Sequence, residues 1–289
     1  MYISIILPTY NRAHIIEECI QSVLDQSYKE WELLILDDNS SDNTYEIGIR
    51  YQNLDTRIQY HKNLIRLNSL GNKNKGIKLA QYPYIFIIED DLILDKDCIL
   101  NLVKSYTELS KIFSVGAIAP RLNSPNPREN IPDKEPFVLR KISGEIWNNY
   151  DVDGNIPIET FTLHACSLIP KNIIYIVDGY SSAEYIGNCF REETDFYFRI
   201  RAKGYKLFFE PRAEALHKNE VKGGCKLNNE IKTHFYCIRN QWVFSRKFFH
   251  KTAYIMFPFF IIQYIYHKII QDRIKKRKQI VSKKNSLLV

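Results

Sequence analysis

Short apolar runs alternate with amphipathic segments over the first hundred residues. Residues 2–7, 32–36, 57–60 and 84–88 are rich in β-branched and aromatic side chains, and their length is that of buried strands. Between the first two runs, apolar side chains recur at helical spacing over residues 15–24, which predicts a helix with one face packed on a sheet. Strands that alternate with helices indicate βαβ units. The sequence therefore predicts an α/β fold with a mainly parallel sheet flanked by helices.

Helix caps and prolines place the remaining elements. A second helix is expected to begin near Ser41, a residue type that caps helix N-termini well. Five prolines between residues 120 and 136 predict a long loop. Beyond it, residues 161–169 and 205–209 are expected to form strands and residues 194–203 a helix. The loop is expected to divide a donor half from an acceptor half.

Polar side chains gather where three of the predicted strands end. In parallel sheets ligands bind at the carboxyl ends of the strands, so these groups should face one crevice. They are Thr9, Tyr10, Asn11 and Arg12 after the first run, Asp37 and Asp38 after the second, and Glu89, Asp90 and Asp91 after the fourth.

The formal charge of +7 is concentrated at the C-terminus. From Arg239 onward the chain holds twelve Lys and Arg residues and the single acid Asp272, a charge of +11, so residues 1–238 carry −4. A nucleic-acid-binding protein usually carries basic charge on its folded body. We therefore expect no nucleic-acid partner, and anionic lipid as the partner of the basic tail.

The cysteines and the N-terminus favour a reducing location. The six cysteines are scattered, without a CxxC pair that would indicate zinc or redox chemistry, and several lie in apolar runs as expected for buried thiols. The first apolar run, residues 3–7, is short, lacks a basic leader and stops at Pro8, unlike a cleavable signal peptide. The expected location is cytosolic.

The acidic triplet Glu89-Asp90-Asp91 is costly in itself, because carboxylates held close together raise one another's pKa. A hard divalent cation, Mg²⁺ or Mn²⁺, would neutralise them and leave coordination positions open for phosphate oxygens. The alternative is a solvated acidic turn before a helix. For Asp37-Asp38 the alternatives are a turn with a helix cap, or an acceptor for a ligand such as a nucleobase imide.

Five motifs stand out, and the first three together are highly specific. They are Ile5-Ile6-Leu7-Pro8-Thr9-Tyr10-Asn11-Arg12, Leu36-Asp37-Asp38-Asn39-Ser40, Gly71-Asn72-Lys73-Asn74-Lys75-Gly76-Ile77, Cys166-Ser167-Leu168-Ile169-Pro170 with Val177-Asp178-Gly179-Tyr180, and Glu192-Glu193-Thr194-Asp195-Phe196 with Arg199 and Gly204-Tyr205. These segments resemble glycosyltransferase family 2, the inverting enzymes of the GT-A fold, over roughly residues 2–220. The resemblance implies a Rossmann-like mixed, mainly parallel sheet.

The resemblance implies a nucleotide-sugar site. Thr9, Tyr10 and Asp38 would hold the nucleobase, with Asp38 accepting its imide proton. Lys73 would meet the diphosphate. The other donor-binding residues in the matching motifs are Pro8, Asn11, Arg12, Glu89 and Asp90.

The resemblance also implies a divalent metal, Mn²⁺ or Mg²⁺. Asp91 would ligate the metal, while an acid beside it contacts the ribose. The motif begins with Glu89, where the family more commonly has Asp. His217 matches a late histidine that in some relatives joins the metal or the diphosphate; the alternative is a surface or capping residue.

Glu193 aligns with the acid that family members use as general base, although Asp is usual there. Glu192 or Asp195 could fill that role instead, and the alternative for the whole stretch is a charged helix N-terminus favoured by the dipole. The implied reaction is in-line attack of an acceptor hydroxyl on the anomeric carbon, with inversion. The base takes the proton, and the metal with Lys73 neutralises the departing diphosphate.

The expected organisation is a GT-A domain over residues 1–228, with halves at 1–119 and 137–228, and C-terminal helices over 229–289. Residues 253–270 are apolar and aromatic but interrupted by polar residues, and are marginal for a membrane span. Because basic residues flank both ends, we expect residues 250–284 to lie on an anionic, cytosolic membrane face. The alternatives are a helix pair that completes the core and a contact between two copies of a homodimer.

The expected function is metal-dependent transfer of a sugar from a nucleotide-diphosphate sugar, with UDP-sugar as the favoured donor. The expected acceptor is a hydroxyl of a glycan or a lipid-linked molecule, in cell-surface polysaccharide or glycan synthesis. One alternative is a nucleotide-sugar-binding protein without catalysis. Another is a sugar nucleotidyltransferase, although the N-terminal region lacks the Gly-rich phosphate loop usual in such enzymes. A dinucleotide oxidoreductase is disfavoured because no GxGxxG follows the first strand.

Overall fold

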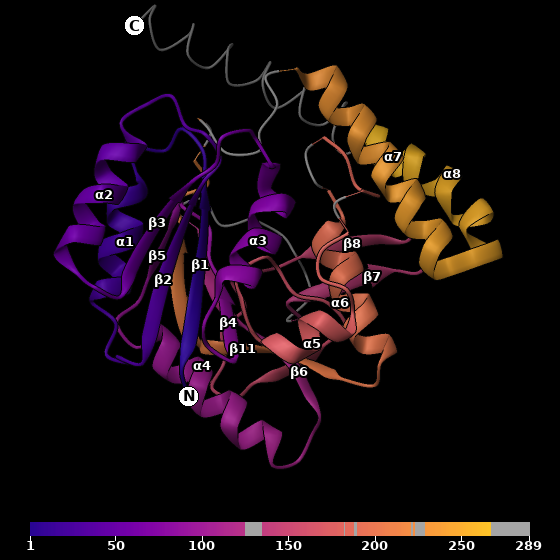
Figure 1. Cartoon of the computed structure of the whole chain (residues 1–289). Coiled ribbons are helices and arrows are strands. Elements are labelled where there is room, and N and C mark those ends of the chain that lie inside the picture. Colours follow the sequence, from indigo (N-terminus) through magenta and orange to yellow (C-terminus); the bar gives the residue numbers. More distant parts are fainter. Residues whose placement is uncertain (125–134, 182, 188–189, 221, 223–228, 267–289) are drawn as a thin grey trace, which may run out of the picture.

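The computed structural model describes residues 1–124, 135–181, 183–187, 190–220, 222 and 229–266 (Figure 1). Its centre is a nine-stranded sheet in the order β3-β2-β1-β4-β10-β6-β11-β5, with β9 also paired to β11. The strands are β1 (Ile3–Thr9), β2 (Trp31–Asp37), β3 (Ile58–Lys62), β4 (Tyr84–Ile87), β5 (Leu92–Leu94), β6 (Val115–Asn123), β9 (Ile158–Thr160), β10 (Ser167–Pro170) and β11 (Lys206–His217).

The pairing of the strands confirms the predicted mixed, mainly parallel sheet. Strands β3, β2, β1 and β4 run parallel to one another, as do β6 and β11. Strand β10 joins the two groups and is antiparallel to both β4 and β6. Strands from before and after residues 125–134 therefore belong to one continuous sheet.

Helices cover both faces of this sheet (Figure 1). Helices α1 (Ile16–Leu24), α2 (Thr44–Leu54) and α4 (Cys98–Ser110) share one apolar core with the face of β1 that carries Ile5 and Leu7. Helices α3 (Asn68–Leu79), α5 (Lys171–Ile176) and α6 (Glu192–Ala202) share a second core with the opposite face. Because successive strand residues point to opposite faces, a strand between two cores is apolar on both of them, as β1 is apart from the buried Ser4 and its last residue, Thr9.

The C-terminal part of the described chain is a helical hairpin beside α6. It consists of α7 (Glu230–Phe249), a short 3₁₀ turn (His250–Thr252) and α8 (Ala253–Tyr264), and Figure 1 shows α7 and α8 side by side. The two-stranded hairpin of β7 (Phe137–Arg140) and β8 (Glu145–Asn148) lies beside α6 and α7 (Figure 1). Among the described residues, no helix is both long and apolar enough to cross a membrane.

Three local predictions need correction. Helix α2 begins at Thr44 and not near Ser41, because the Asp42 carboxylate accepts from the backbone N–H of Ala13 and of Thr44 and so extends the preceding turn. Of the strand expected at 161–169, only residues 167–169 are strand, as the first part of β10, and β9 ends before this range. Strand β11 continues past residue 209 to His217, through an irregularity in its pairing with β6.

The proline-rich loop and the cysteines are described only in part. Pro120 lies within β6, so the loop begins later than expected, and residues 125–134 lie outside the described residues. The prediction of buried thiols is confirmed for Cys19, Cys98, Cys166 and Cys237. Cys189 and Cys225 lie outside the described residues.

Candidate functional site

A cavity of about 270 Å³ lies at the carboxyl ends of β1, β2 and β4. It brings together nearly all of the predicted donor and metal residues. Its lining is Pro8, Thr9, Tyr10, Arg12, Asp38, Arg66, Ser69, Asn72, Lys73, Ile88, Glu89, Asp90, Asp91, His217 and Asn219. Asn11 is not part of this lining: it has a φ of 53° and its side-chain oxygen accepts from Ser41 N at 2.9 Å, which ties the loop after β1 to the loop after β2.

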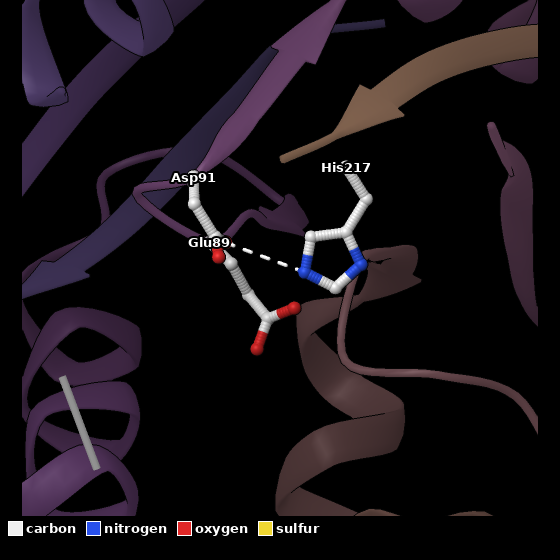
Figure 2. A group of neighbouring side chains, drawn as sticks. All are labelled: Glu89, Asp91 and His217. Carbon is white, nitrogen blue, oxygen red and sulfur yellow. Dashed lines mark ion pairs between the residues drawn. The ribbon is translucent and has the colours of Figure 1, made fainter. Parts of the chain in front are cut away.

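The pairing of β11 with β5 carries His217 to the acidic triplet. In this antiparallel pair His217 lies opposite Leu92, the residue that directly follows Asp91 in the chain. Its Nε2 atom is 3.5 Å from Asp91 Oδ1, and Figure 2 shows the ring pointing toward both acids. Glu89, Asp91 and His217 each offer one ligand atom, and these atoms lie within 4.8 Å of one another.

The three acids of the triplet differ in their pKa. Burial raises the pKa of Glu89 to about 7, with repulsion from Glu193 adding to the shift. Burial also raises the pKa of Asp90 to about 7, against the charge of Arg12, whose Nε is 3.4 Å away. Burial acts to raise the pKa of Asp91 as well, but hydrogen bonding to His217 and to Glu220 N lowers it below its ordinary value. Asp91 is therefore the acid held most firmly as a carboxylate.

The donor set of this group fits a divalent cation. Two carboxylates and one imidazole converge from two different strand ends, and oxygen ligands suit Mg²⁺ and Mn²⁺. Burial raises the pKa of Glu89 and Asp90, and repulsion from neighbouring carboxylates adds to the shift, so both groups favour their neutral forms more than free acids do. A bound cation would reverse that balance, so these side chains fit the predicted metal.

Asp38 already has several donors around it. Its Oδ1 accepts from Leu67 N at 2.6 Å, and its Oδ2 accepts from Asn68 N at 3.0 Å. Asp38 therefore anchors the loop before α3 as well as facing the cavity. Arg66 in that loop lies 3.7 Å above the ring of Tyr10. Sequence reasoning missed Arg66, because a lone arginine in a loop outside the matching motifs gives no signal.

Lys73 and Glu193, which come from different halves of the chain, form an ion pair. Lys73 Nζ lies 2.9 Å from Glu193 Oε1, and the side chains are 3% and 30% exposed. Burial alone would lower the pKa of Lys73, but the carboxylate of Glu193 and the neighbouring acids raise it well above its ordinary value. Lys73 is therefore a buried cation at the boundary between the predicted diphosphate site and the predicted base.

A second cavity, of about 310 Å³, adjoins the first and shares Ser69 and Glu89 with it. Its polar lining includes the predicted base candidates Glu192 and Glu193. The complete lining is Ser69, Glu89, Phe137, Asn148, Tyr150, Thr162, Leu163, Phe190, Arg191, Glu192, Glu193 and Thr194. The aromatic side chains and the carboxylates together suit a sugar or another polyhydroxyl ligand.

The three acids in the first turn of α6 have different surroundings. Asp195 is fully buried and accepts from Arg199 Nε at 2.6 Å and from Tyr185 Oη at 3.0 Å. Glu192 is also buried. Glu193 is the most exposed of the three and faces both Lys73 and the second cavity. The structure thus separates their environments, while the choice of base stays a prediction.

The fold and the site together define a class of protein. A mixed sheet of this order, with a cavity and an acidic metal-type cluster at its strand ends, is the architecture of the GT-A class. A model of Glycosyl transferase family 2 matches residues 4–167, more than half of the chain. The chain belongs to this family.

Known proteins similar to the chain agree with this result. It is 29% identical over 163 residues to the GalNAc(5)-diNAcBac-PP-undecaprenol beta-1,3-glucosyltransferase of Campylobacter jejuni, covering 50% of each chain. It is 27% identical over 215 residues to the poly-beta-1,6-N-acetyl-D-glucosamine synthase of Staphylococcus epidermidis, covering 73% of this chain and 48% of the synthase. The chain thus spans about half the length of these relatives.

The fold also matches a solved structure of GalNAc-T7 with UDP, GalNAc and Mn²⁺. The TM-score is 0.67 at 14% identity, and the match covers 85% of this chain and 48% of GalNAc-T7. At this identity the likeness concerns the fold alone. It confirms the GT-A architecture expected from the sequence.

Proposed function

We propose that the protein is a metal-dependent inverting glycosyltransferase that moves a sugar from a nucleotide-diphosphate sugar to an acceptor hydroxyl. One observation carries this proposal: two cavities meet at Ser69 and Glu89, with Asp91 and His217 beside the first and Glu193 beside the second. A donor and an acceptor in these cavities would come together between the predicted metal ligands and the predicted base.

The nucleotide would occupy the part of the first cavity near the end of β1. Tyr10 offers an aromatic face there, and Asp38 offers carboxylate oxygens to an imide N–H. Lys73 lines the same cavity and would offer a cation to the diphosphate. UDP-sugar is the first choice of donor, because uracil carries an imide N–H that could donate to the Asp38 carboxylate.

The reaction would proceed as a single in-line displacement. The acceptor oxygen forms a bond to the anomeric carbon while the bond from that carbon to the diphosphate oxygen breaks, and the bonding electrons leave with the diphosphate. Glu193 takes the proton of the acceptor hydroxyl, and Lys73 stabilises the negative charge of the leaving group. The attack from the side opposite the leaving group inverts the anomeric configuration.

Asp91, Glu89 and His217 would hold the divalent cation, with Mn²⁺ favoured over Mg²⁺ because one ligand is an imidazole. The cation would supply further neutralisation of the diphosphate charge. Asp91 is the central residue of this proposal, because its pKa is lowered whereas that of Glu89 is raised to about 7.

A lipid-linked or membrane-presented glycan is the proposed acceptor class, in cell-surface polysaccharide or glycan synthesis. One relative is named for a polyprenol-linked oligosaccharide and another for a polysaccharide. The mixture of aromatic and carboxylate side chains in the second cavity suits such an acceptor.

We expect selective thermal stabilisation by one class of nucleotide sugar in the presence of Mn²⁺. A ligand at 100 times its Kd stabilises the native state by about 2.7 kcal/mol, which raises the Tm of a domain of this size by about 5–10 °C. The measurement is a thermal-shift panel of UDP-, GDP- and dTDP-sugars with their free sugars as controls. A panel without any shift would contradict the proposal, and stabilisation by a nucleoside triphosphate with pyrophosphate release would favour a nucleotidyltransferase.

We further propose that the α7–α8 hairpin rests on an anionic membrane surface on the cytosolic side. Large apolar side chains are exposed along it, namely Ile231, Phe235, Tyr254, Ile255, Phe259, Ile262, Ile265 and Tyr266. Arg246 lies over the rings of Trp242 and Tyr254, and Lys251 is exposed in the turn between the two helices. The sequence beyond residue 266, which lies outside the described residues, adds eight more Lys and Arg residues. Apolar side chains beside cations suit the interface of an anionic bilayer.

Replacing two exposed isoleucines of α8 should weaken membrane binding. We expect the Ile255→Ser and Ile262→Ser double variant to bind phosphatidylglycerol vesicles about tenfold or more weakly than the unaltered protein, because each side chain loses part of its apolar burial. The measurement is co-sedimentation with vesicles containing phosphatidylglycerol or phosphatidylcholine alone. Leu54→Ser with Ile112→Ser, two equally exposed apolar positions elsewhere, is the matched control. Equal sedimentation of both double variants would refute the membrane proposal.

A further inference from the structure

Helix α7 holds the segment that precedes α6 against its side. Asn240 of α7 is fully buried, and its Nδ2 donates to Ile186 O at 2.9 Å. Gly187 has a φ of 77°, and a Cβ at this position would lie 2.1 Å from the ring of Tyr236. The close approach and the backbone conformation both require glycine here. Residues 186 and 187 therefore lie directly on α7.

A second tie joins α7 to the residue just before α6. Arg191 has a φ of 77°, a backbone conformation that is unfavourable for residues other than glycine. Such a conformation persists only where the surrounding structure stabilises it. Its buried Nε donates to Gln241 Oε1 at 2.6 Å, and Gln241 Nε2 donates to Gly144 O at 3.2 Å. Gln241 thus fixes Arg191 relative to the turn between β7 and β8.

A third tie reaches the first turn of α6 itself. Lys247 Nζ lies 2.8 Å from Asp195 Oδ2 and 2.6 Å from Glu184 Oε2. One cation of α7 therefore connects the start of α6 with the segment that leads into it. Because Asp195 is fully buried, its interaction with Lys247 is little screened by solvent.

We propose that Gln241 and Lys247 are positioning residues for Glu193, acting through Arg191 and Asp195. Glu193 lies between these two residues in the chain, so their ties to α7 fix the backbone that carries it. The inference rests on the proposed function only in taking Glu193 as the general base. Both α6 and α7 lie outside the residues 4–167 matched by the family model, so the argument depends on contacts within this chain.

The first test is hydrogen exchange, which needs neither donor nor acceptor. We expect Lys247→Met to raise the exchange rate of the amides of residues 191–197 about tenfold or more, because these amides lose a restraint on local opening. Lys247→Arg should preserve the slow exchange. Lys232→Met, which removes an exposed cation from the first turn of the same helix, is the matched control. Unchanged exchange in Lys247→Met would overturn the proposal.

The second test separates positioning from general destabilisation. With UDP-GlcNAc as donor, Lys247→Met should lower the kcat of UDP release by about 10- to 100-fold at unchanged donor KM, since small displacements of a reacting group are costly. Lys247→Arg should restore most of the rate. A lowered Tm with kcat unchanged would show a purely structural role and refute the inference. If the unaltered protein releases UDP from no nucleotide sugar, the proposed function fails, while hydrogen exchange still decides whether α7 holds α6.

Discussion

Asp91→Asn is expected to lower sugar transfer by about 100- to 1,000-fold while leaving the fold intact. The substitution keeps the shape of the side chain and removes its charge, which is the property that the metal proposal requires. Loss of one group that stabilises charge in a transition state typically has an effect of this size. Two quantities are measured for the variant and for the unaltered protein. One is the initial rate of UDP release at saturating Mn²⁺, and the other is the Mn²⁺ concentration that gives half of this rate.

The surroundings of Asp91 make this variant informative. Asp91 accepts from Glu220 N at 2.9 Å, and an asparagine can turn its carbonyl oxygen toward the same donor. The Tm should therefore change little in the absence of metal. Asp25→Asn, at an exposed position on α1's C-terminal side, is the matched control and should retain full activity. Asp91 would be excluded as a metal ligand if Asp91→Asn kept full activity. The same conclusion would follow if the variant needed the same Mn²⁺ concentration as the unaltered protein.

The N-terminal half of the fold could be predicted because its signals are local. Strand β1 is apolar on both faces, and the amphipathic pattern of α1 repeats within a few turns, so both elements can be found without knowledge of their neighbours. The parallel arrangement of these strands then follows from the helices between them. The motif residues at the strand ends share one cavity for the same topological reason.

The parts that the sequence could not predict depend on contacts between distant segments. His217 was expected near the metal only from the family resemblance. It reaches Asp91 because β11 continues past an irregularity and pairs with β5, and no local pattern after residue 209 indicates that register. The ion pair of Lys73 with Glu193 joins residues 120 positions apart. Asp195 was a candidate base by sequence, and its burial against Arg199 becomes visible only in the folded chain.

The two proposals for the C-terminal helices meet in α7. Helix α7 leads into α8 through the 3₁₀ turn, and it is also the helix that contacts Arg191 and Asp195. If α8 rests on a membrane, α7 therefore links the membrane surface to the start of α6. A membrane-bound acceptor would then be presented on the side of the molecule whose rigidity fixes the proposed base. This arrangement gives a physical reason for a basic, aromatic extension on a GT-A fold.

Glu193→Gln is expected to lower kcat by about 100- to 10,000-fold, the range that general-base catalysis typically contributes. Glu192→Gln and Asp195→Asn serve as comparisons. Asp195→Asn should lower the Tm because Asp195 pairs with Arg199 and Lys247, and a larger loss of kcat in Glu192→Gln than in Glu193→Gln would assign the base to Glu192.

Donor binding distinguishes a base from a mere partner of Lys73. The Lys73 side chain is only 3% exposed, and its Nζ lies 2.9 Å from Glu193 Oε1. In Glu193→Gln this carboxylate is lost, and a buried cation without its ionic partner strongly destabilises the folded state. A bound diphosphate would supply the missing negative charge. We therefore expect UDP-GlcNAc with Mn²⁺ to raise the Tm of Glu193→Gln by at least as much as that of the unaltered protein, despite the lost turnover. A smaller rise would mean that Glu193 supports the donor site, and its assignment as the base would then fail.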